Sequence, residues 1–135
     1  MRLVLDTNVL VAALVADGLC RDLVRRRVRN HQLCTSEPLL KELTATLRRK
    51  FGVKATEIPL LEEYRRHATI VEPMTLATPV SRDPDDDMVL ATAIAAKANV
   101  LISGDDDLLC LKSHQGVRIL SPRQFLELLD GRLDN

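Results

Sequence analysis

Acidic residues follow two apolar, branched segments of the sequence. Asp6 comes directly after residues 2–5, and Asp105 comes after Ser103-Gly104 at the end of residues 100–103. Both segments suit buried parallel strands. In open α/β sheets the functional sites lie beyond the carboxyl ends of the strands, although an aspartate there can also be a simple cap or turn residue. Together the two segments predict that Asp6 and Asp105 meet at one edge of a sheet.

Two predicted helices add carboxylates to this edge. Glu42 stands three residues after Leu39, at the border of an apolar helical stripe. The run 83–87 (DPDDD) opens a later helix, and capping or the helix dipole explains only one or two of its four aspartates. Like charges held this close raise one another's pKa and oppose folding unless a cation neutralises them. Asp86 or Asp87 is therefore the expected contribution of this run.

Oxygen ligands without a convergent His or Cys favour a hard cation, Mg²⁺ or Mn²⁺, over zinc. Such an ion lowers the pKa of a bound water and neutralises charge on a phosphodiester. The chain also has a basic half, because residues 1–67 hold 13 Lys/Arg against 8 Asp/Glu, whereas residues 68–135 hold 6 against 11. Within it, Arg25, Arg26 and Arg29 are the candidate residues for holding a nucleic-acid backbone beside the metal site. An ordinary solvated helix face or a dimer surface is the alternative.

Alternating strands and helices must position these residues. Strands are expected at residues 2–5, 32–35, 69–72, 100–103 and 117–120; helices are expected at residues 9–15, 19–28, 37–51, 55–67, 84–97 and 122–129, with a short helical turn from residue 106. Asn8, Ser36 and Thr56 are the expected caps of three of these helices. The alternation predicts an α/β fold of three layers (α/β/α) around a parallel sheet of about five strands, in a single domain over residues 1–135.

Composition excludes several classes of protein. The chain has no Trp, two Phe and one Tyr, which argues against base-stacking platforms. No apolar run reaches the roughly 18 residues of a membrane span, and the first residues suit a strand rather than a signal peptide. Cys20, Cys34 and Cys110 are odd in number and lie in apolar surroundings, as expected of reduced core thiols in a cytoplasmic protein.

Four segments, taken in order, closely resemble the successive motifs of PIN-domain proteins. They are residues 5–8 (LDTN), 36–43 (SEPLLKEL), 83–93 (DPDDDMVLATA) and 101–105 (LISGD). The subgroup most resembled is that of toxin components of toxin–antitoxin systems, the VapC-like ribonucleases. The resemblance implies the strand order 3-2-1-4-5 and a metal-dependent ribonuclease that hydrolyses RNA phosphodiester bonds. It further implies Mg²⁺ or Mn²⁺ as cofactor, a homodimer and an antitoxin protein as partner, in the cytoplasm of a bacterium or archaeon.

Residue by residue, the resemblance assigns metal-binding and catalytic roles to Asp6, Glu42 and Asp105. The third acidic position falls at Asp86, with Asp87 and Asp83 as nearby candidates. Asn8 and Ser103 match positions of supporting polar residues, although Thr is commoner at the second.

Two other functions remain open at this point. One is a catalytically silent PIN-like module that binds RNA or a partner protein. The other is an aspartyl phosphoacceptor domain, which also has an Asp after its first strand. The dehalogenase-like pattern needs a second Asp two residues later, where this chain has Asn8, and the receiver-like pattern needs an acidic pair before Asp6.

Overall fold

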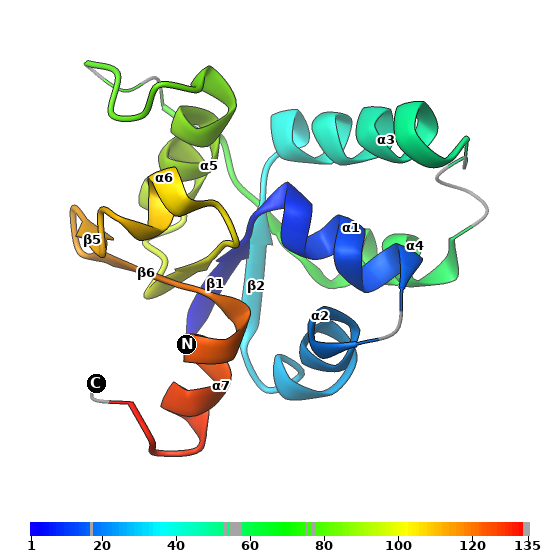
Figure 1. The fold of residues 1–135 in the computed structure, drawn as a ribbon. Coiled ribbons are helices and arrows are strands. Elements are labelled where there is room, and N and C mark those ends of the chain that lie inside the picture. The colour runs from blue at the N-terminus through cyan, green and yellow to red at the C-terminus, as the bar shows by residue number, and fades with distance from the viewer. Residues whose placement is uncertain (17, 53, 55–57, 75, 77, 134–135) are drawn as a thin grey trace.

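A twisted six-stranded sheet runs through the molecule, with helices on both faces (Figure 1). The computed structural model describes residues 1–16, 18–52, 54, 58–74, 76 and 78–133. The strands are β1 (Arg2–Leu5), β2 (Gln32–Thr35), β3 (Thr69–Ile70), β4 (Val100–Ile102), β5 (Ser113–His114) and β6 (Val117–Leu120). Their order is β3-β2-β1-β4-β6-β5, and all neighbouring pairs are parallel except β5 with β6.

The predicted fold class and the predicted order 3-2-1-4-5 are confirmed, since the five expected strands appear as β3-β2-β1-β4-β6. The structure adds β5, a two-residue antiparallel strand at the edge of the sheet. It also shortens the third strand, which was expected over residues 69–72 and pairs with β2 only through Thr69 and Ile70. Leu3 lies opposite both Leu33 and Val100, so β1 is central.

The helices mostly begin and end where capping residues predict. They are α1 (Thr7–Val15), α2 (Leu19–Asp22), the π-helical segment η1 (Leu23–Arg27), α3 (Glu37–Phe51), α4 (Pro59–His67), α5 (Pro84–Ala95), α6 (Asp106–Leu109) and α7 (Pro122–Leu129). Gly52 ends α3 with a φ of 63°, a left-handed conformation that glycine adopts without steric cost. The helix expected at residues 55–67 is described from Pro59, and Thr56 lies outside the described residues.

The predicted cap Asn8 is wrong, and the predicted cap Ser36 is correct in position but not in its hydrogen bonding. The N-cap of α1 is Asp6, whose carboxylate accepts the Thr7 N–H, so Asn8 lies inside the first turn. Ser36 stands at the N-cap position of α3 but makes no capping hydrogen bond with its side chain. Its buried hydroxyl instead lies 2.9 Å from the Thr92 hydroxyl on α5, because the segment packs against that helix.

The helix expected over residues 19–28 is interrupted by η1. The Val28 N–H donates to the Leu23 carbonyl at 3.2 Å, which closes a wider turn than that of an α-helix. Leu23, Val24 and Val28 remain buried in this geometry. The side chains between and after them point outward, and Arg25 and Arg29 are exposed.

Each face of the sheet has its own core. Leu3 and Leu5 of β1 pack on the side of α1, α3, α4, η1 and α7, whereas Val4 packs on the side of α5 and α6. This alternation follows from the two-residue period of a strand and produces the three layers. Among the cysteines, Cys34 is buried and Cys20 is half-buried, but Cys110 is exposed, so the expectation of three core thiols is wrong for Cys110. None of the described helices is both long and apolar enough to cross a membrane.

Candidate metal centre

The two central strands bring their following residues together at the carboxyl edge of the sheet. Leu5 of β1 lies opposite Ile102 of β4, and the Asp6 N–H donates to the Ile102 carbonyl at 2.9 Å. Ser103 then lies beside Asp6 and is fully buried. Its hydroxyl donates to Asp6 Oδ2 at 2.6 Å and accepts from the Asp105 N–H at 3.0 Å. Ser103 thus joins the ends of both strands in one hydrogen-bonded unit.

Asp6 is a buried carboxylate whose oxygens both have donors. Oδ1 accepts the Thr7 N–H at 2.7 Å, and Oδ2 accepts the Ser103 hydroxyl. Only 5% of the residue is exposed. Burial raises the pKa of Asp6; the two hydrogen bonds oppose this, and the nearby charges of Asp105 and Asp83 raise it further. Burial therefore makes the ionised Asp6 carboxylate costly in the folded chain, a cost that a bound cation would offset.

Three aspartates come closest together. Asp86, Asp105 and Asp107 each place a carboxylate oxygen within 4.8 Å of the other two, and we call them the acidic triad. Asp105 caps α6, where its Oδ1 accepts the Asp107 N–H at 2.8 Å. Asp86 is 6% exposed, and Oδ2 accepts the Ser81 hydroxyl at 3.0 Å. Burial is the main cause that raises the pKa of Asp86 to about 6, with Asp105 and Asp6 contributing.

The structure separates the roles of the aspartates in the 83–87 run. Asp83 is exposed and caps α5 by accepting the Asp85 N–H at 2.9 Å. Asp87 accepts the backbone N–H groups of Val80 and Ser81 at 3.1 and 2.8 Å, so it holds the loop before α5. Asp86 alone of the run belongs to the acidic triad. Geometry therefore favours Asp86 over Asp87 and Asp83 at the third acidic position.

Glu42 approaches the same edge from α3. Its side chain is half-buried, as its place at the border of the apolar stripe predicts. Burial raises the pKa of Glu42, the charges of Asp85 and Asp6 raise it further, and a hydrogen bond from the Thr7 side chain lowers it. Asp6 and Glu42 thus interact electrostatically with the aspartates of this edge, although neither belongs to the triad.

Asp107 was missed by the sequence reasoning, which treated it as part of a helical start. Its spacing of two from Asp105 was the available signal, because a capping side chain accepts the N–H of the residue two positions later. Asp107 also forms an ion pair with Arg82, whose Nη2 lies 2.8 Å from Oδ1. A cation of the protein itself therefore already contacts one member of the triad.

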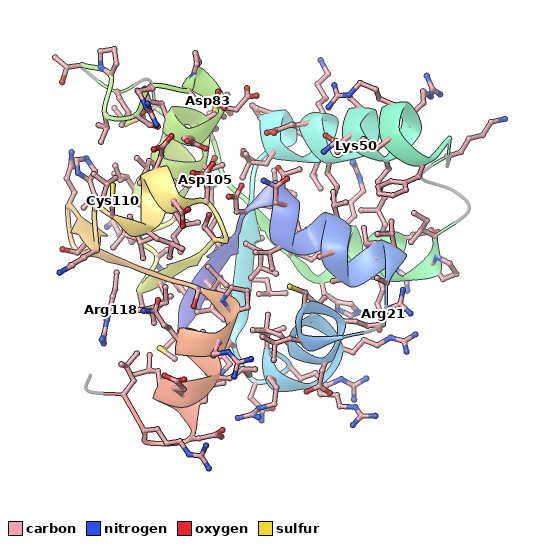
Figure 2. The ribbon with its side chains drawn as sticks, viewed as in Figure 1. Arg21, Lys50, Asp83, Asp105, Cys110 and Arg118 are labelled. Atoms are coloured by element: carbon pink, nitrogen blue, oxygen red, sulfur yellow. The ribbon has the colours of Figure 1, made fainter. Side chains whose placement is uncertain are left out.

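Two predicted groups lie away from the triad. Asn8 is exposed in the first turn of α1. Arg25, Arg26 and Arg29 precede β2, so they lie at the amino edge of the sheet, whereas the triad lies at its carboxyl edge. In Figure 2 the labelled Asp83 and Asp105 stand near α5 and α6, while the labelled Arg21, which comes four residues before Arg25, stands on the far side of α1. The expectation that the arginines flank the metal site is wrong, since the chain crosses the whole sheet between the two groups.

The donor set of the triad fits a divalent cation. All its candidate ligand atoms are carboxylate oxygens, which Mg²⁺ and Mn²⁺ prefer. Burial and neighbouring charges raise the pKa values of Asp6, Glu42 and Asp86, so a bound cation would stabilise the ionised forms of these carboxylates.

Comparison with protein families gives one finding for this chain. The family model described as PIN domain matches residues 2–107, a range that ends at the last residue of the triad and includes every carboxylate of the site. No curated protein matches the sequence.

Proposed function

Because the chain belongs to the PIN-domain family, we propose that it is an endoribonuclease that hydrolyses RNA phosphodiester bonds with Mg²⁺ or Mn²⁺. PIN domains have a nuclease-type fold and are generally metal-dependent nucleases. The observation that carries the proposal is the acidic triad at the carboxyl edge, close enough for one cation to contact all three side chains. Asp6 and Glu42 add negative charge to the same edge.

Asp86, Asp105 and Asp107 would hold the metal, with Asp6 and Glu42 contributing from the side of β1 and α3. When bound, the ion supplies Lewis-acid stabilisation of charge on the phosphodiester and lowers the pKa of a coordinated water. The protein supplies the positioning. Ser103 fixes the Asp6 carboxylate, and the Asp107 N–H fixes that of Asp105. Both carboxylates keep lone pairs free, because an ionised carboxylate offers about four acceptor positions.

The exposed Arg82 side chain is a further proposed substrate-binding group beside the triad. It is an exposed side chain in contact with Asp107, so its guanidinium can turn from the carboxylate to a phosphate oxygen. Arg82→Gln should therefore raise the KM for RNA while leaving the thermal midpoint unchanged.

The finer assignment is to the toxin of a toxin–antitoxin pair, acting in the cytoplasm as a homodimer that a cognate antitoxin protein inhibits. The support for it is the resemblance of the four sequence motifs. Expression of the chain in a bacterial host should arrest growth, and Asp105→Asn should relieve the arrest. Normal growth with the folded wild-type protein would contradict the toxin role while leaving the nuclease proposal intact.

The nuclease proposal is tested by incubating labelled single-stranded RNA with the protein in EDTA, and then in Mn²⁺. Wild type should cleave only with Mn²⁺, and Asp105→Asn should not cleave. Asp106→Asn is the matched control, since Asp106 is exposed next to the triad but outside it. A folded protein that binds RNA without cutting it would be a silent module. Phosphorylation by acetyl phosphate without cleavage would identify a phosphoacceptor.

A further inference from the structure

A groove of about 840 Å³ opens at the amino edge of the sheet. It lies between α4 and the continuous stretch of chain that runs from η1 to the start of β2. Its Arg, His and Glu lining residues are Arg25, Arg26, Arg29, His31, Glu63 and His67, and we call it the basic groove. One acidic side chain faces three arginines, so the groove is suited to an anion.

The arginines of residues 21–29 divide into structural and unengaged side chains. Arg21 donates to the carbonyls of Ala13 and Leu14, which ties the segment to α1. Arg27 pairs with Asp130 beyond α7.

The groove arginines are held less firmly or not at all. Arg26 lies 3.6 Å from Asp22 in a pair whose side chains are largely exposed, a type of contact that contributes little. Arg25 and Arg29 have no ion pair or side-chain hydrogen bond in the described part of the chain. Two guanidinium groups on the rim of the groove are thus free for a ligand.

The π-helical turn explains why the side chains of Arg25 and Arg26 line the groove instead of entering the core. Leu23, Val24 and Val28 all enter the core, and the turn that joins them directs Arg25 and Arg26 to the outside. The core residues fix the backbone, so only the rotamers of the arginines must be ordered when a ligand binds. Arginine suits such a site because its planar guanidinium can donate to two phosphate oxygens at once.

RNA needs such a surface on this molecule because the carboxyl edge is acidic. The triad, Asp6 and Glu42 repel a polyanion except where a cation intervenes. The four residues of β1 separate the two edges by about 13 Å at about 3.3 Å per residue. At about 3.4 Å per stacked nucleotide, an RNA that reaches from one edge to the other spans at least about four nucleotides.

We propose that the basic groove binds the phosphate backbone of the RNA substrate, several nucleotides away from the bond that is cleaved. The inference rests on the proposed ribonuclease function for its occupant, and it adds a second RNA site remote from the metal centre. The groove holds the strand by charge and leaves the choice of cleaved bond to the carboxyl edge.

The test compares two double variants with the same change in charge. Arg25→Gln with Arg29→Gln removes the two unengaged arginines of the basic groove. Arg48→Gln with Arg49→Gln removes two exposed arginines of α3 that line a different groove. Binding of a labelled 20-nucleotide RNA is measured in EDTA over a range of salt concentrations, where no metal-dependent cleavage interferes.

The groove variant should bind roughly tenfold more weakly, and its salt slope should fall by about 1.4, because each phosphate contact on a single strand contributes about 0.7. The α3 variant should retain most of the affinity and the slope. In Mn²⁺, the groove variant should have a raised KM for the 20-nucleotide RNA and an unchanged kcat/KM for a dinucleotide RNA, which is too short to reach the groove from the carboxyl edge.

Three results would overturn the inference. One is an equal loss of RNA affinity in both double variants, which would mean that RNA binding depends only on the net charge of the protein. A second is unchanged RNA binding together with a change in oligomeric state in size-exclusion chromatography, which would assign the groove to a second copy of the chain. The third is unchanged binding with no change in oligomeric state. Because binding is read in EDTA, absence of nuclease activity would contradict the proposed function without affecting this result.

Discussion

The two edges of the sheet carry opposite charge in opposite environments. At the carboxyl edge, Asp6 and Asp86 are buried and their pKa values are raised, mainly by the loss of water around them. At the amino edge, Arg25 and Arg29 stand in solvent on a turn whose apolar residues are buried. Ionising the buried carboxylates costs free energy in the folded chain, whereas the exposed guanidinium groups remain charged at almost no cost.

Because of this difference, the charges of the two edges should respond to different solutes. Buried carboxylates are weakly screened by salt, so a bound cation is what stabilises them. Exposed arginines are strongly screened, so salt concentration controls their attraction for a polyanion. Under the two proposals the carboxyl edge depends on metal and the amino edge depends on salt concentration, and the predictions that follow test that separation.

The largest effect is expected from Asp6→Asn. The amide keeps an oxygen that accepts the Thr7 N–H, so α1 should retain its cap, but the charge that supports a cation is lost. RNA cleavage in Mn²⁺ should fall at least about 100-fold. Loss of a residue that only hydrogen-bonds to a metal ligand lowers activity by about 10- to 100-fold, and loss of the Asp6 charge should cost more. The assay is cleavage of labelled RNA, with circular dichroism to show that both proteins are folded.

The matched control for Asp6→Asn is Asp106→Asn, which removes one exposed carboxylate beside the triad and should leave cleavage near the wild-type rate. A folded Asp6→Asn variant that cuts RNA as fast as wild type would contradict the metal mechanism and would leave helix capping as the role of Asp6.

A somewhat smaller effect is expected from Asp107→Asn. The substitution removes one of the three carboxylates of the triad, so Mn²⁺ affinity measured by calorimetry should fall by at least about 10-fold, the lower end of the cost of losing a residue that supports a metal ligand. Asp87→Asn should change the affinity far less, because Asp87 is engaged with the backbone of Val80 and Ser81. Equal losses in the two variants would mean that total charge, rather than the triad, determines binding.

The pH dependence of stability is expected to differ between the metal-free and metal-bound protein. The pKa of Asp86 rises from 3.8 to about 6 on folding, so between these values the folded chain binds more protons than the unfolded chain. The free energy of unfolding without metal should therefore fall by roughly 2 kcal/mol as the pH rises from about 4 to about 6. Asp6 and Glu42 shift in the same direction and add to the fall.

Saturating Mn²⁺ should remove this fall, since the ion stabilises the ionised carboxylates of the folded state. Thermal unfolding in EDTA and in Mn²⁺ across this pH range provides the measurement, and Asp86→Asn should flatten the metal-free curve. Metal-free stability that rises from pH 4 to pH 6 would show that the crowded carboxylates are not a net cost to folding.

The smallest effect is expected at the amino edge. The double substitution Arg25→Gln with Arg29→Gln should change the free energy of unfolding by no more than about 0.5 kcal/mol, because neither side chain has a partner among the described residues. Urea unfolding with and without Mn²⁺ provides the measurement. A loss of several kcal/mol would make these arginines structural and remove the contrast between the edges.

Much of the arrangement follows from local sequence signals. Apolar, branched segments of four residues predict β1 and β6 as they stand, and the parallel order then brings Asp6 and Asp105 to one edge. Glu42 and Asp86 could be added because helical spacing places them toward the core. Metal binding by Glu42 and Asp86 remains a prediction.

The misses come from contacts that a linear pattern does not contain. Asp107 joins the triad because its own N–H binds Asp105, and Asp87 leaves it because two backbone N–H groups of a preceding loop bind Asp87 instead. The arginines were expected beside the metal because charge was judged along the sequence. Their distance from it is set by β2, which carries the chain across the sheet before α3 begins.

Asp6, Asp83 and Asp105 each cap a helix, at the starts of α1, α5 and α6, with one carboxylate oxygen on a backbone N–H. A neutral Asn, Ser or Thr can satisfy a helix start as well. One nucleotide change that converts such an Asp to Asn would thus erase the charge and preserve the architecture. Lineages of this fold can therefore lose chemistry in a single step and persist as inert scaffolds, free to acquire a different role.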